Sequence, residues 1–447
     1  MTTTDIRAGR LSQGQLAENF SDHHPPLNSA NAIVESDRCY FCYDAPCIEA
    51  CPTAIDIPNF IRKISTGNLK GSAKDILTQN IMGGMCARVC PTEILCEGVC
   101  VRNTHEEKPV RIGDLQRYAT DWFFESGETL FKRGEPTGKR IAIVGGGPAG
   151  LSCAHRLAVL GHESVIFEAR EKLSGLNEYG IAAYKTVNNF AQREVEFILQ
   201  IGGIEVRTNH VLGRDVKIDD LRNEFDAVFL SIGLGDVNDL GLKSDDTEGV
   251  YNAVDIIAEL RQAKNLDELP VGRRIVVIGG GNTAIDISVQ SKKLGAEDVS
   301  LVYRRGAQHM SATWKEQEFA KSNGVNIKYW LSPKSLHSEN GHVSGVEFEC
   351  TKLNSDGKLS GTGESRFMEA DVVFKAIGQS MQDTIFSVSD IPEMTKGKIA
   401  INSEFETSLA GVWSGGDCVG SGEDLTVQAV EDGKQAANSI HQRIMQQ

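Results

Sequence analysis

Eight of the eleven cysteines in this chain fall into two short runs between residues 39 and 100. The first run has the spacing C-x2-C-x4-C-x3-C-P, and the second has C-x3-C-P-x4-C-x3-C. Thiolates in such runs hold cubane iron-sulfur clusters, and a cysteine before proline can ligate the second of two clusters. The spacing predicts two clusters, with ligands among Cys39, Cys42, Cys47, Cys51, Cys86, Cys90, Cys96 and Cys100.

Two other chemistries of clustered cysteines fit this pattern less well. A disulfide framework is typical of short secreted chains, but residues 1–31 are polar and do not resemble a signal peptide. Structural zinc favours paired C-x2-C spacing, which only Cys39 and Cys42 show. Zinc stays open as an alternative because spacing alone does not identify a metal. The scattered Cys153, Cys350 and Cys418 are expected to be buried structural thiols.

A glycine-rich fingerprint follows the cysteine runs. The apolar residues 140–144 predict a buried parallel strand, which leads directly into GGGPAG at residues 145–150. Gly145, Gly147 and Gly150 match G-x-G-x-x-G, in which glycines permit a tight turn and bring a pyrophosphate close to a helix N-terminus. A second expected strand, over residues 164–167, ends at Glu168, whose carboxylate can accept hydrogen bonds from a ribose. Together these features predict a dinucleotide-binding domain.

The same arrangement recurs later in the chain. Residues 274–278 predict another buried strand, followed by GGGNTA at residues 279–284 and a further strand over residues 299–303. That strand ends in Arg304 and Arg305, and an arginine at this place can accommodate the 2′-phosphate of NADP. An acid in the first fold and arginines in the second imply FAD in the first and a nicotinamide nucleotide in the second.

The C-terminal region carries further residues expected at the flavin. A short apolar strand over residues 411–414 ends in Gly416 and Asp417, and a helix is expected to open at residues 426–430. The candidate flavin residues are Gly145, Gly147, Pro148, Ala149, Gly150, Glu168, Gly175, Leu176, Gly416, Asp417 and Gln428. The candidate nicotinamide-nucleotide residues are Gly279, Gly281, Asn282, Thr283, Ala284, Arg304, Arg305, Ala376 and Gly378.

Composition and patterning set the outer limits. A chain of 447 residues with 40% apolar residues and 45 glycines suits a globular α/β protein of several domains. The net charge of −15 disfavours nucleic acid and anionic membranes as partners. Reduced thiols and the absence of a long apolar run point to the cytoplasm. Apolar spacing between the cysteine runs predicts a helical front domain with its cysteines on loops, ending at a linker over residues 132–139.

With both cysteine runs and both fingerprints in view, residues 35–445 resemble the N-terminal half of dihydropyrimidine dehydrogenase and the electron-input subunit of its bacterial two-subunit form. They are similar, more distantly, to the small subunit of glutamate synthase. The resemblance implies a helical domain with two [4Fe-4S] clusters at residues 1–135, followed by two α/β dinucleotide-binding domains like those of glutathione reductase. The expected FAD domain, residues 136–255 and 385–447, is split by an NAD(P)H domain at residues 256–384.

The resemblance also implies ligand sets. Cys39, Cys42, Cys47 and Cys100 match the ligands of the first cluster, and Cys51, Cys90, Cys96 and Gln116 match those of the second. Cys86 is then left without iron. Gln116 is the most discriminating residue, because the glutamate synthase branch has an acid at that position. The nucleotide stays open: Arg304 matches one of the two arginines that bind the 2′-phosphate in the animal enzyme, but the other falls at Ser311, and the bacterial relatives use NADH.

The function implied by the resemblance is electron input. NAD(P)H would reduce FAD, and electrons would pass through the clusters to a partner subunit that holds FMN and further clusters and reduces uracil or thymine. No stretch of this chain resembles the FMN barrel of that partner. A small subunit of glutamate synthase, with a large amidotransferase partner, is the alternative within enzymes. A scaffold with degenerate nucleotide sites is the non-enzymatic alternative, and the intact glycines of both fingerprints argue against it.

Overall fold

The computed structural model describes residues 10–242, 247–269, 271–381, 385–386, 391–420 and 422–446. These residues form two compact units, which are described separately. The first unit comprises the residues up to His23, Tyr179–Val187 and Asp236–Ser380, and the second comprises His24–Glu178, Asn188–Gly235 and the residues from Met381 onward. The parts of the predicted domains at residues 1–9, 243–246, 270, 382–384, 387–390, 421 and 447 lie outside the described residues. No helix in the described ranges has the length and apolar character to span a bilayer.

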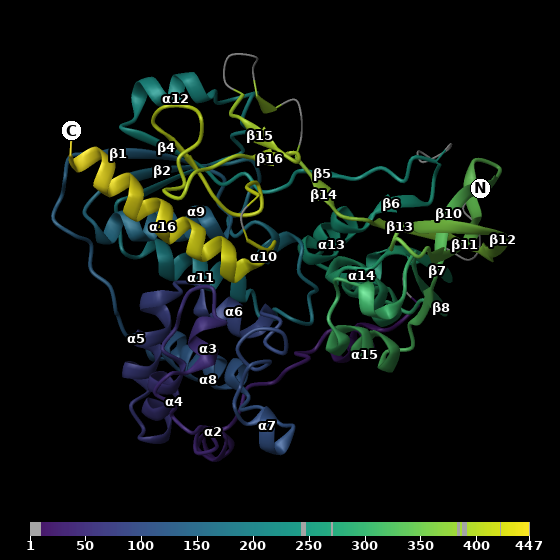
Figure 1. Ribbon diagram of the computed structural model, residues 1–447, viewed down its shortest axis with the longest axis horizontal. Coiled ribbons are helices and arrows are strands. Elements are labelled where there is room, and N and C mark those ends of the chain that lie inside the picture. Colours follow the sequence, from purple (N-terminus) through teal and green to yellow (C-terminus); the bar gives the residue numbers. More distant parts are fainter. Residues whose placement is uncertain are drawn as a thin grey trace. The chain divides into compact units, whose positions relative to one another are not determined.

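Helices make up the N-terminal part of the second unit (Figure 1). They are α2 (Ser29–Ser36), α3 (Pro46–Glu49), α4 (Ile57–Ser65), α5 (Leu69–Gln79), α6 (Gly83–Val89), α7 (Asn103–Glu106) and α8 (Ile112–Ser126). The Asp56 side chain caps α4 by accepting a hydrogen bond from the Asn59 amide. Apolar residues at helical spacing on α4, among them Phe60 and Ile64, are buried in a core shared with α5 and α8. Most of the clustered cysteines lie on loops as expected, but Cys47 lies in α3 and Cys86 in α6.

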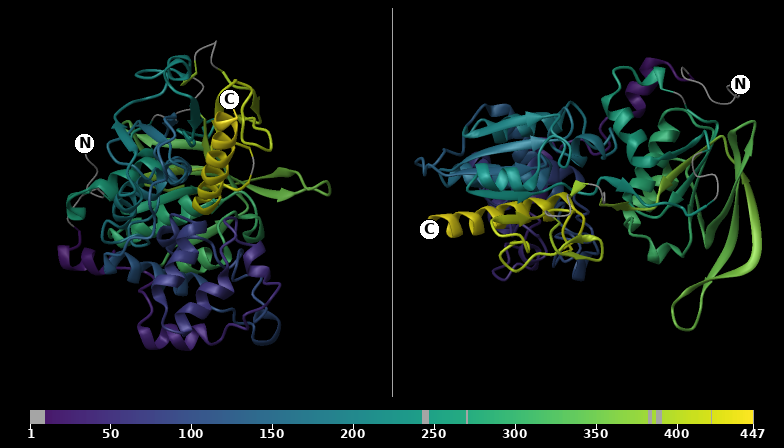
Figure 2. Two further views of the ribbon diagram at one scale, coloured as in Figure 1. Left: turned by 90° about the vertical axis from the view of Figure 1, so that its left-hand side faces the viewer. Right: turned by 90° about the horizontal axis from the view of Figure 1, so that it is seen from above.

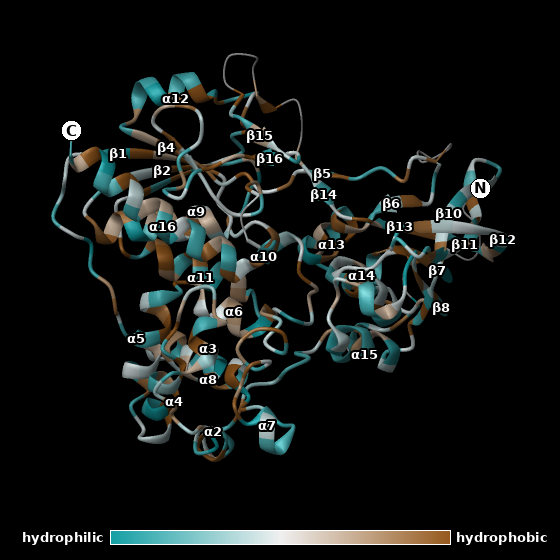
Figure 3. Ribbon diagram, viewed as in Figure 1, coloured by the Kyte–Doolittle hydropathy of each residue, from teal (hydrophilic) through white to brown (hydrophobic). Residues whose placement is uncertain are grey.

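A five-stranded parallel sheet forms the rest of the second unit. Its strands, in spatial order, are β17 (Val412–Ser414), β4 (Ala227–Leu230), β1 (Arg140–Val144), β2 (Glu163–Glu168) and β3 (Ile204–Thr208). The helices around it are α9 (Pro148–Val159), α11 (Phe190–Leu199), α12 (Ile218–Glu224) and α16 (Thr426–Met445). Figure 3 shows apolar residues along β1 and β4 and hydrophilic residues on α12, as expected for a buried sheet under an exposed helix. Because β17 pairs with β4, the C-terminal segment returns to a sheet whose other strands all precede Asp236–Ser380, the longest segment of the first unit.

A second five-stranded parallel sheet organises the first unit. Its spatial order is β6 (Val250–Asn252), β13 (Val372–Ala376), β7 (Arg274–Gly279), β8 (Asp298–Tyr303) and β9 (Asn326–Tyr329). It is accompanied by α13 (Ala253–Gln262), α14 (Asn282–Lys293) and α15 (Trp314–Ser322). A separate antiparallel meander of β10 (Leu331–Glu339), β11 (His342–Leu353) and β12 (Leu359–Glu369) extends as the long ribbon in Figure 2. The predicted fold class, a helical part followed by two parallel α/β sheets with one split around the other, is confirmed.

Two short features of the first unit have no strong sequence signal. α1 (Gln13–Asn19) packs Leu16 and Phe20 against Leu260, so the N-terminal arm belongs to this unit. β6 pairs with β13, which puts residues 250–252 in this sheet, whereas the sequence analysis assigns them to the FAD domain. A three-residue strand is too short to show periodicity, so only its pairing reveals which sheet it joins. The other predicted domain boundaries stay predictions.

Candidate functional site

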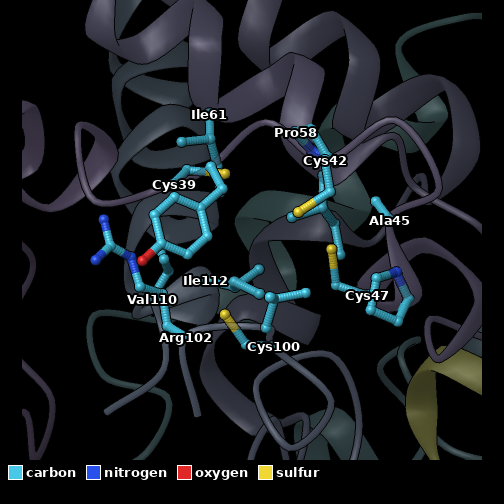
Figure 4. Close-up of a pocket in the computed structure, with 14 residues that line it drawn as sticks. Cys39, Cys42, Ala45, Cys47, Pro58, Ile61, Cys100, Arg102, Val110 and Ile112 are labelled. Atoms are coloured by element: carbon cyan, nitrogen blue, oxygen red, sulfur yellow. The ribbon is translucent and has the colours of Figure 1, made fainter. Parts of the chain in front are cut away.

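Four cysteines of the second unit line one cavity (Figure 4). Cys39 follows α2, Cys42 lies in the next turn, Cys47 lies in α3, and Cys100 precedes α7. Their sulfur atoms face a common space, and the walls are mainly apolar, from Ala45, Pro46, Ile57, Pro58, Ile61, Val110 and Ile112. The fold therefore brings together, from both cysteine runs, the four residues that the resemblance assigns to the first cluster.

The cavity changes the acidity of its thiols. Burial raises the pKa of the Cys47 thiol to about 12, and it also raises the pKa of Cys39. Buried thiols like these are protonated until a cation replaces the proton, so metal binding here would release protons. No group of three His, Cys, Asp or Glu side chains in the described ranges is arranged to hold one metal ion. Four sulfur atoms spread around an apolar cavity fit a multi-iron group.

A second group of thiols surrounds the C-terminal end of α6. A hydrogen bond with Cys86, followed by burial, raises the pKa of Cys90 well above its ordinary value, and the neighbouring Cys96 and Cys51 raise it further. Burial is the main cause of the raised pKa of Cys96, with Glu97 and Cys51 adding to it. The structure therefore gathers the three cysteines assigned to the second cluster, and it adds Cys86, which the resemblance leaves without iron.

Gln116 projects from α8 toward α6. Its side chain is 8% exposed, and its Nε2 donates a hydrogen bond of 2.7 Å to the carbonyl oxygen of Gly83 at the start of α6. Because the nitrogen end of the amide is engaged, its oxygen end is left to act as an acceptor or ligand. A buried glutamine whose oxygen accepts no hydrogen bond from the residues that the structure describes suits the role that the resemblance gives to Gln116.

The first glycine fingerprint lies where β1 turns into α9. Gly145 has φ +101°, and a Cβ there would lie 2.3 Å from the carbonyl oxygen of Ser231, so only glycine fits this turn. A Cβ on Gly150 would lie 2.0 Å from the carbonyl oxygen of Gly145, so the third glycine lets the helix pack against the turn. Glu168 ends β2 and accepts hydrogen bonds of 2.8 Å from the amides of Gly146 and Arg170. Its carboxylate therefore faces the loop, as ribose binding requires.

The other candidate flavin residues converge on this loop. Gly147 caps α9, which begins with Pro148 and Ala149, and Gly175 lies against Gly147 just before Leu176 opens α10 (Leu176–Tyr179). Gly416 packs against Ala149, with its Cβ position 3.1 Å from the Ala149 Cβ. Burial raises the pKa of the adjacent Asp417 to about 6. The structure thus collects around the first fingerprint residues that lie more than two hundred positions apart in the sequence.

Asp432 joins this site and has no counterpart among the sequence candidates. It lies on α16, accepts a 3.0 Å hydrogen bond from the Gly416 amide, and also accepts one of 2.8 Å from the side chain of Gln428. The neighbouring Gly433 lets α16 cross α9 closely, because a Cβ there would lie 2.0 Å from the Ala149 carbonyl oxygen. The available signal was an Asp-Gly pair inside a helix, where glycine is unfavourable without a packing reason.

The second fingerprint lies in the first unit, where β7 turns into α14. A Cβ on Gly279 would lie 2.1 Å from the carbonyl oxygen of Ala376, so the end of β13 closes over the loop. Gly281 caps α14, whose first residues are Asn282, Thr283 and the fully buried Ala284. Gly378 follows with φ +95° beside Asn238. All of these candidate nucleotide residues therefore lie at the carboxyl edge of the same sheet, where such folds bind ligands.

Arg304 and Arg305 follow β8 at this edge. Their carbonyl oxygens accept hydrogen bonds from the Thr351 hydroxyl, at 2.7 Å, and from the Trp330 amide, at 3.3 Å, so the backbone is held by the meander. Neither guanidinium pairs with a carboxylate in the part of the chain that the structure describes, which leaves them available to a phosphate. The Ser311 hydroxyl lies 3.2 Å from the Cβ position of Gly281, so a small neutral group stands beside the loop.

Comparisons with known proteins identify the families of the two parts of this chain. Residues 16–128 match the family described as dihydropyrimidine dehydrogenase domain II, 4Fe-4S cluster, and residues 139–433 match the pyridine nucleotide-disulphide oxidoreductase family. The glutamate synthase [NADPH] small chain of Escherichia coli (strain K12) is 34% identical over 442 residues, covering 94% of this chain and 93% of that relative. The NAD-dependent dihydropyrimidine dehydrogenase subunit PreT of the same strain is 32% identical over 426 residues, covering 95% and 97%.

Solved structures support the fold alone. The Mycobacterium tuberculosis FprA in complex with NADPH matches with a TM-score of 0.58 at 18% identity, over 70% of this chain and 85% of that one. Both the predicted resemblance and the predicted cofactors, iron-sulfur, FAD and a nicotinamide nucleotide, are confirmed. The chain belongs to the pyridine nucleotide-disulphide oxidoreductase family, as a member that carries an iron-sulfur domain of the dihydropyrimidine dehydrogenase type ahead of its FAD and NAD(P) domains.

Proposed function

We propose that this chain is the electron-input subunit of a two-subunit dihydropyrimidine dehydrogenase. In this role it binds FAD at the first fingerprint, NAD(P)H at the second, and two [4Fe-4S] clusters at the two thiol groups. These cofactors supply hydride acceptance and one-electron transfer. A separate subunit with FMN would receive the electrons and reduce uracil or thymine to the 5,6-dihydro product.

Gln116 is the observation that carries this proposal. Its buried amide donates a hydrogen bond through Nε2 to Gly83, which a carboxylate could not do, and its Oε1 remains available as a ligand. The resemblance associates an amide here with dihydropyrimidine dehydrogenases and an acid with glutamate synthases. The four thiols that share the first cavity support the assignment of the other cluster.

The protein's own residues have binding and orienting roles in this function. The backbone amides at the start of α9 and α14 can hold pyrophosphates, and Glu168 can hold a ribose. No acid or base on the protein is needed for a hydride to pass between two bound cofactors. All eleven cysteines are free thiols, which suits a reducing compartment, and we place the protein in the cytoplasm on that ground.

A small subunit of glutamate synthase is the second candidate. It is favoured by the 34% identity to that chain, slightly above the 32% to PreT. Both candidates share electron input from a nicotinamide nucleotide and differ in the partner that receives the electrons.

The experiment begins with the isolated chain. Anaerobic stopped-flow reduction by NADH and NADPH in parallel would follow flavin bleaching, with iron and sulfide counted on the same sample. We expect rapid bleaching and about eight irons per chain. Bleaching without iron would remove the exit route for electrons and contradict the proposal.

The partner is then identified by product. The chain is mixed with a purified FMN-containing dihydropyrimidine dehydrogenase subunit, and separately with a glutamate synthase large subunit, and NAD(P)H oxidation is followed with each substrate. Formation of dihydrouracil supports the proposal. Glutamate formed from glutamine and 2-oxoglutarate, without dihydrouracil, would contradict it and establish the second candidate.

A further inference from the structure

One peptide group at the start of α6 is bonded on both sides by side chains from other elements. Its carbonyl oxygen, from Gly83, accepts the 2.7 Å hydrogen bond from Nε2 of Gln116 on α8. Its N–H, from Gly84, donates a 3.0 Å hydrogen bond to Oε1 of Glu194 on α11. The same carboxylate oxygen accepts a second bond of 3.0 Å from the Met85 amide. A continuous relay therefore connects Glu194 to Gln116 through a single peptide.

The surroundings of Glu194 are closed to water. Its side chain is 0% exposed, and its second oxygen, Oε2, has no hydrogen-bond partner within the described ranges. Phe190 and Phe124 lie close to Gly84, where a Cβ would be 2.6 Å from one ring and 2.8 Å from the other. The absence of a side chain at Gly84 is what lets the carboxylate reach the peptide.

Burying a carboxylate with one oxygen that accepts no hydrogen bond destabilises the folded chain unless another interaction offsets the cost. Burial raises the pKa of Glu194 to about 8, while the two amides and the nearby Arg88 act in the opposite direction. Arg88 stacks on Phe190 and pairs with Asp121, so it is not a direct partner of Glu194.

We propose that Glu194 is a positioning residue that orients Gln116 and tunes the second cluster through the Gly83–Gly84 peptide. This inference rests on the proposed role of Gln116 as a ligand. A carboxylate that accepts from a peptide N–H polarises that peptide and strengthens the hydrogen bond to its carbonyl. The Gln116 amide is thereby held with its nitrogen on Gly83, which leaves its oxygen for the proposed ligand role and makes that oxygen a stronger electron-pair donor.

The direction of the effect on the second cluster follows from charge. Glu194 is ionised above about pH 8. Reduction adds negative charge to a cluster, and above that pH the nearby carboxylate and the more strongly electron-donating oxygen of Gln116 both oppose the change. Neutralising Glu194 removes both effects, so the reduction equilibrium of the second cluster moves toward the reduced state. Helix α6 places Cys90 about 9 Å along its axis from Gly84, close enough for the charge to matter in a buried site.

The test is a redox titration of the full chain with reconstituted clusters at about pH 9, where Glu194 is ionised, followed by electron paramagnetic resonance. In Glu194→Gln we expect an unchanged iron content and a shift of at least tenfold in the reduction equilibrium of the second cluster, equal to about 59 mV for a one-electron couple. Glu196→Gln is the matched control, because Glu196 is exposed on the same helix and carries the same charge. Glu194→Asp retains the charge and should restore most of the original potential.

A second arm isolates the relay. In a Gln116→Glu background the Nε2 donor is absent, so adding Glu194→Gln should move the potential much less than it does in the unmodified chain. An equal shift in both backgrounds, or no shift in Glu194→Gln with full iron, would overturn the proposal. Loss of the second cluster in both Glu194 variants would show that the residue has only a structural role, and this result would also overturn the proposal. The titration needs neither partner nor pyrimidine, so its outcome is independent of the test of the proposed function.

Discussion

Gly150 offers a direct test of how the first fingerprint holds a dinucleotide. It lies in the first turn of α9, and its missing side chain lets the helix approach the turn that follows β1. In Gly150→Ala the new Cβ would lie 2.0 Å from the Gly145 carbonyl oxygen and 2.8 Å from the Ser231 hydroxyl. The hydroxyl can rotate away, but the carbonyl belongs to the backbone of the fingerprint itself.

The magnitude follows from that overlap. Real Cβ atoms do not approach other atoms within 3.0 Å, so the helix and the turn must separate by about 1 Å. Overpacking of this size costs about 1–3 kcal/mol. A displacement of about 1 Å in a binding site can cost about a hundredfold in function, and we expect a loss of that order in flavin affinity.

The assay is flavin content per chain, measured by absorbance after gel filtration, together with the dissociation constant of FAD for the stripped protein. Gly281→Ala, the same change at the second fingerprint, is the control, because its Cβ would meet only the Ser311 hydroxyl at 3.2 Å. The control should retain full flavin. If Gly150→Ala bound FAD as tightly as the unchanged chain, the packing argument for the third glycine would be refuted.

Three further predictions concern the other sites. Gln116→Ala should damage the spectrum of one cluster and slow electron delivery, while flavin reduction by the nicotinamide nucleotide stays intact; a fall in flavin reduction would contradict the assignment. Replacing Arg304 and Arg305 by alanine should raise the KM for NADPH about tenfold more than that for NADH, because a guanidinium pairs with the 2′-phosphate that only NADPH carries. Equal losses in steady-state assays would argue against that contact. Burial lowers the pKa of His155 from 6.5 to about 4, so the folded chain binds this proton less readily than the unfolded chain. The contribution of His155 to the free energy of unfolding is therefore complete above pH 6.5 and falls by roughly 3 kcal/mol as the pH falls to 4. His155→Gln should make the thermal midpoint fall less steeply over this range, and an unchanged slope would refute this role of His155.

Local patterns were sufficient for most of the fold. The strand, glycine triplet and helix at residues 140–159 and again at 274–293 are contiguous in sequence, and the physical demands of a tight turn leave few alternatives to glycine. The two cysteine runs are equally local, and so they marked the iron-sulfur region. The sequence did not predict the sheet to which β6 belongs, because three residues carry too little periodicity to identify one.

The spacing of residues in the sequence does not predict contacts between distant segments. Asp432 reaches Gly416 only because α16 crosses α9. Nothing around Glu194 in the sequence distinguishes it from Glu196, the other acid on α11, and only its burial against α6 does so.

The sequence by itself determined the kinds of chemistry that this chain holds, because thiol spacing and glycine fingerprints are requirements on neighbouring residues. The tertiary structure decided which groups act together: four thiols from two runs in one cavity, and a carboxylate on α11 bonded through one peptide to Gln116 on α8. The physical reason is that hydrogen bonds and burial depend on distance in space, and the elements that supply these partners are separated by tens to hundreds of residues along the chain.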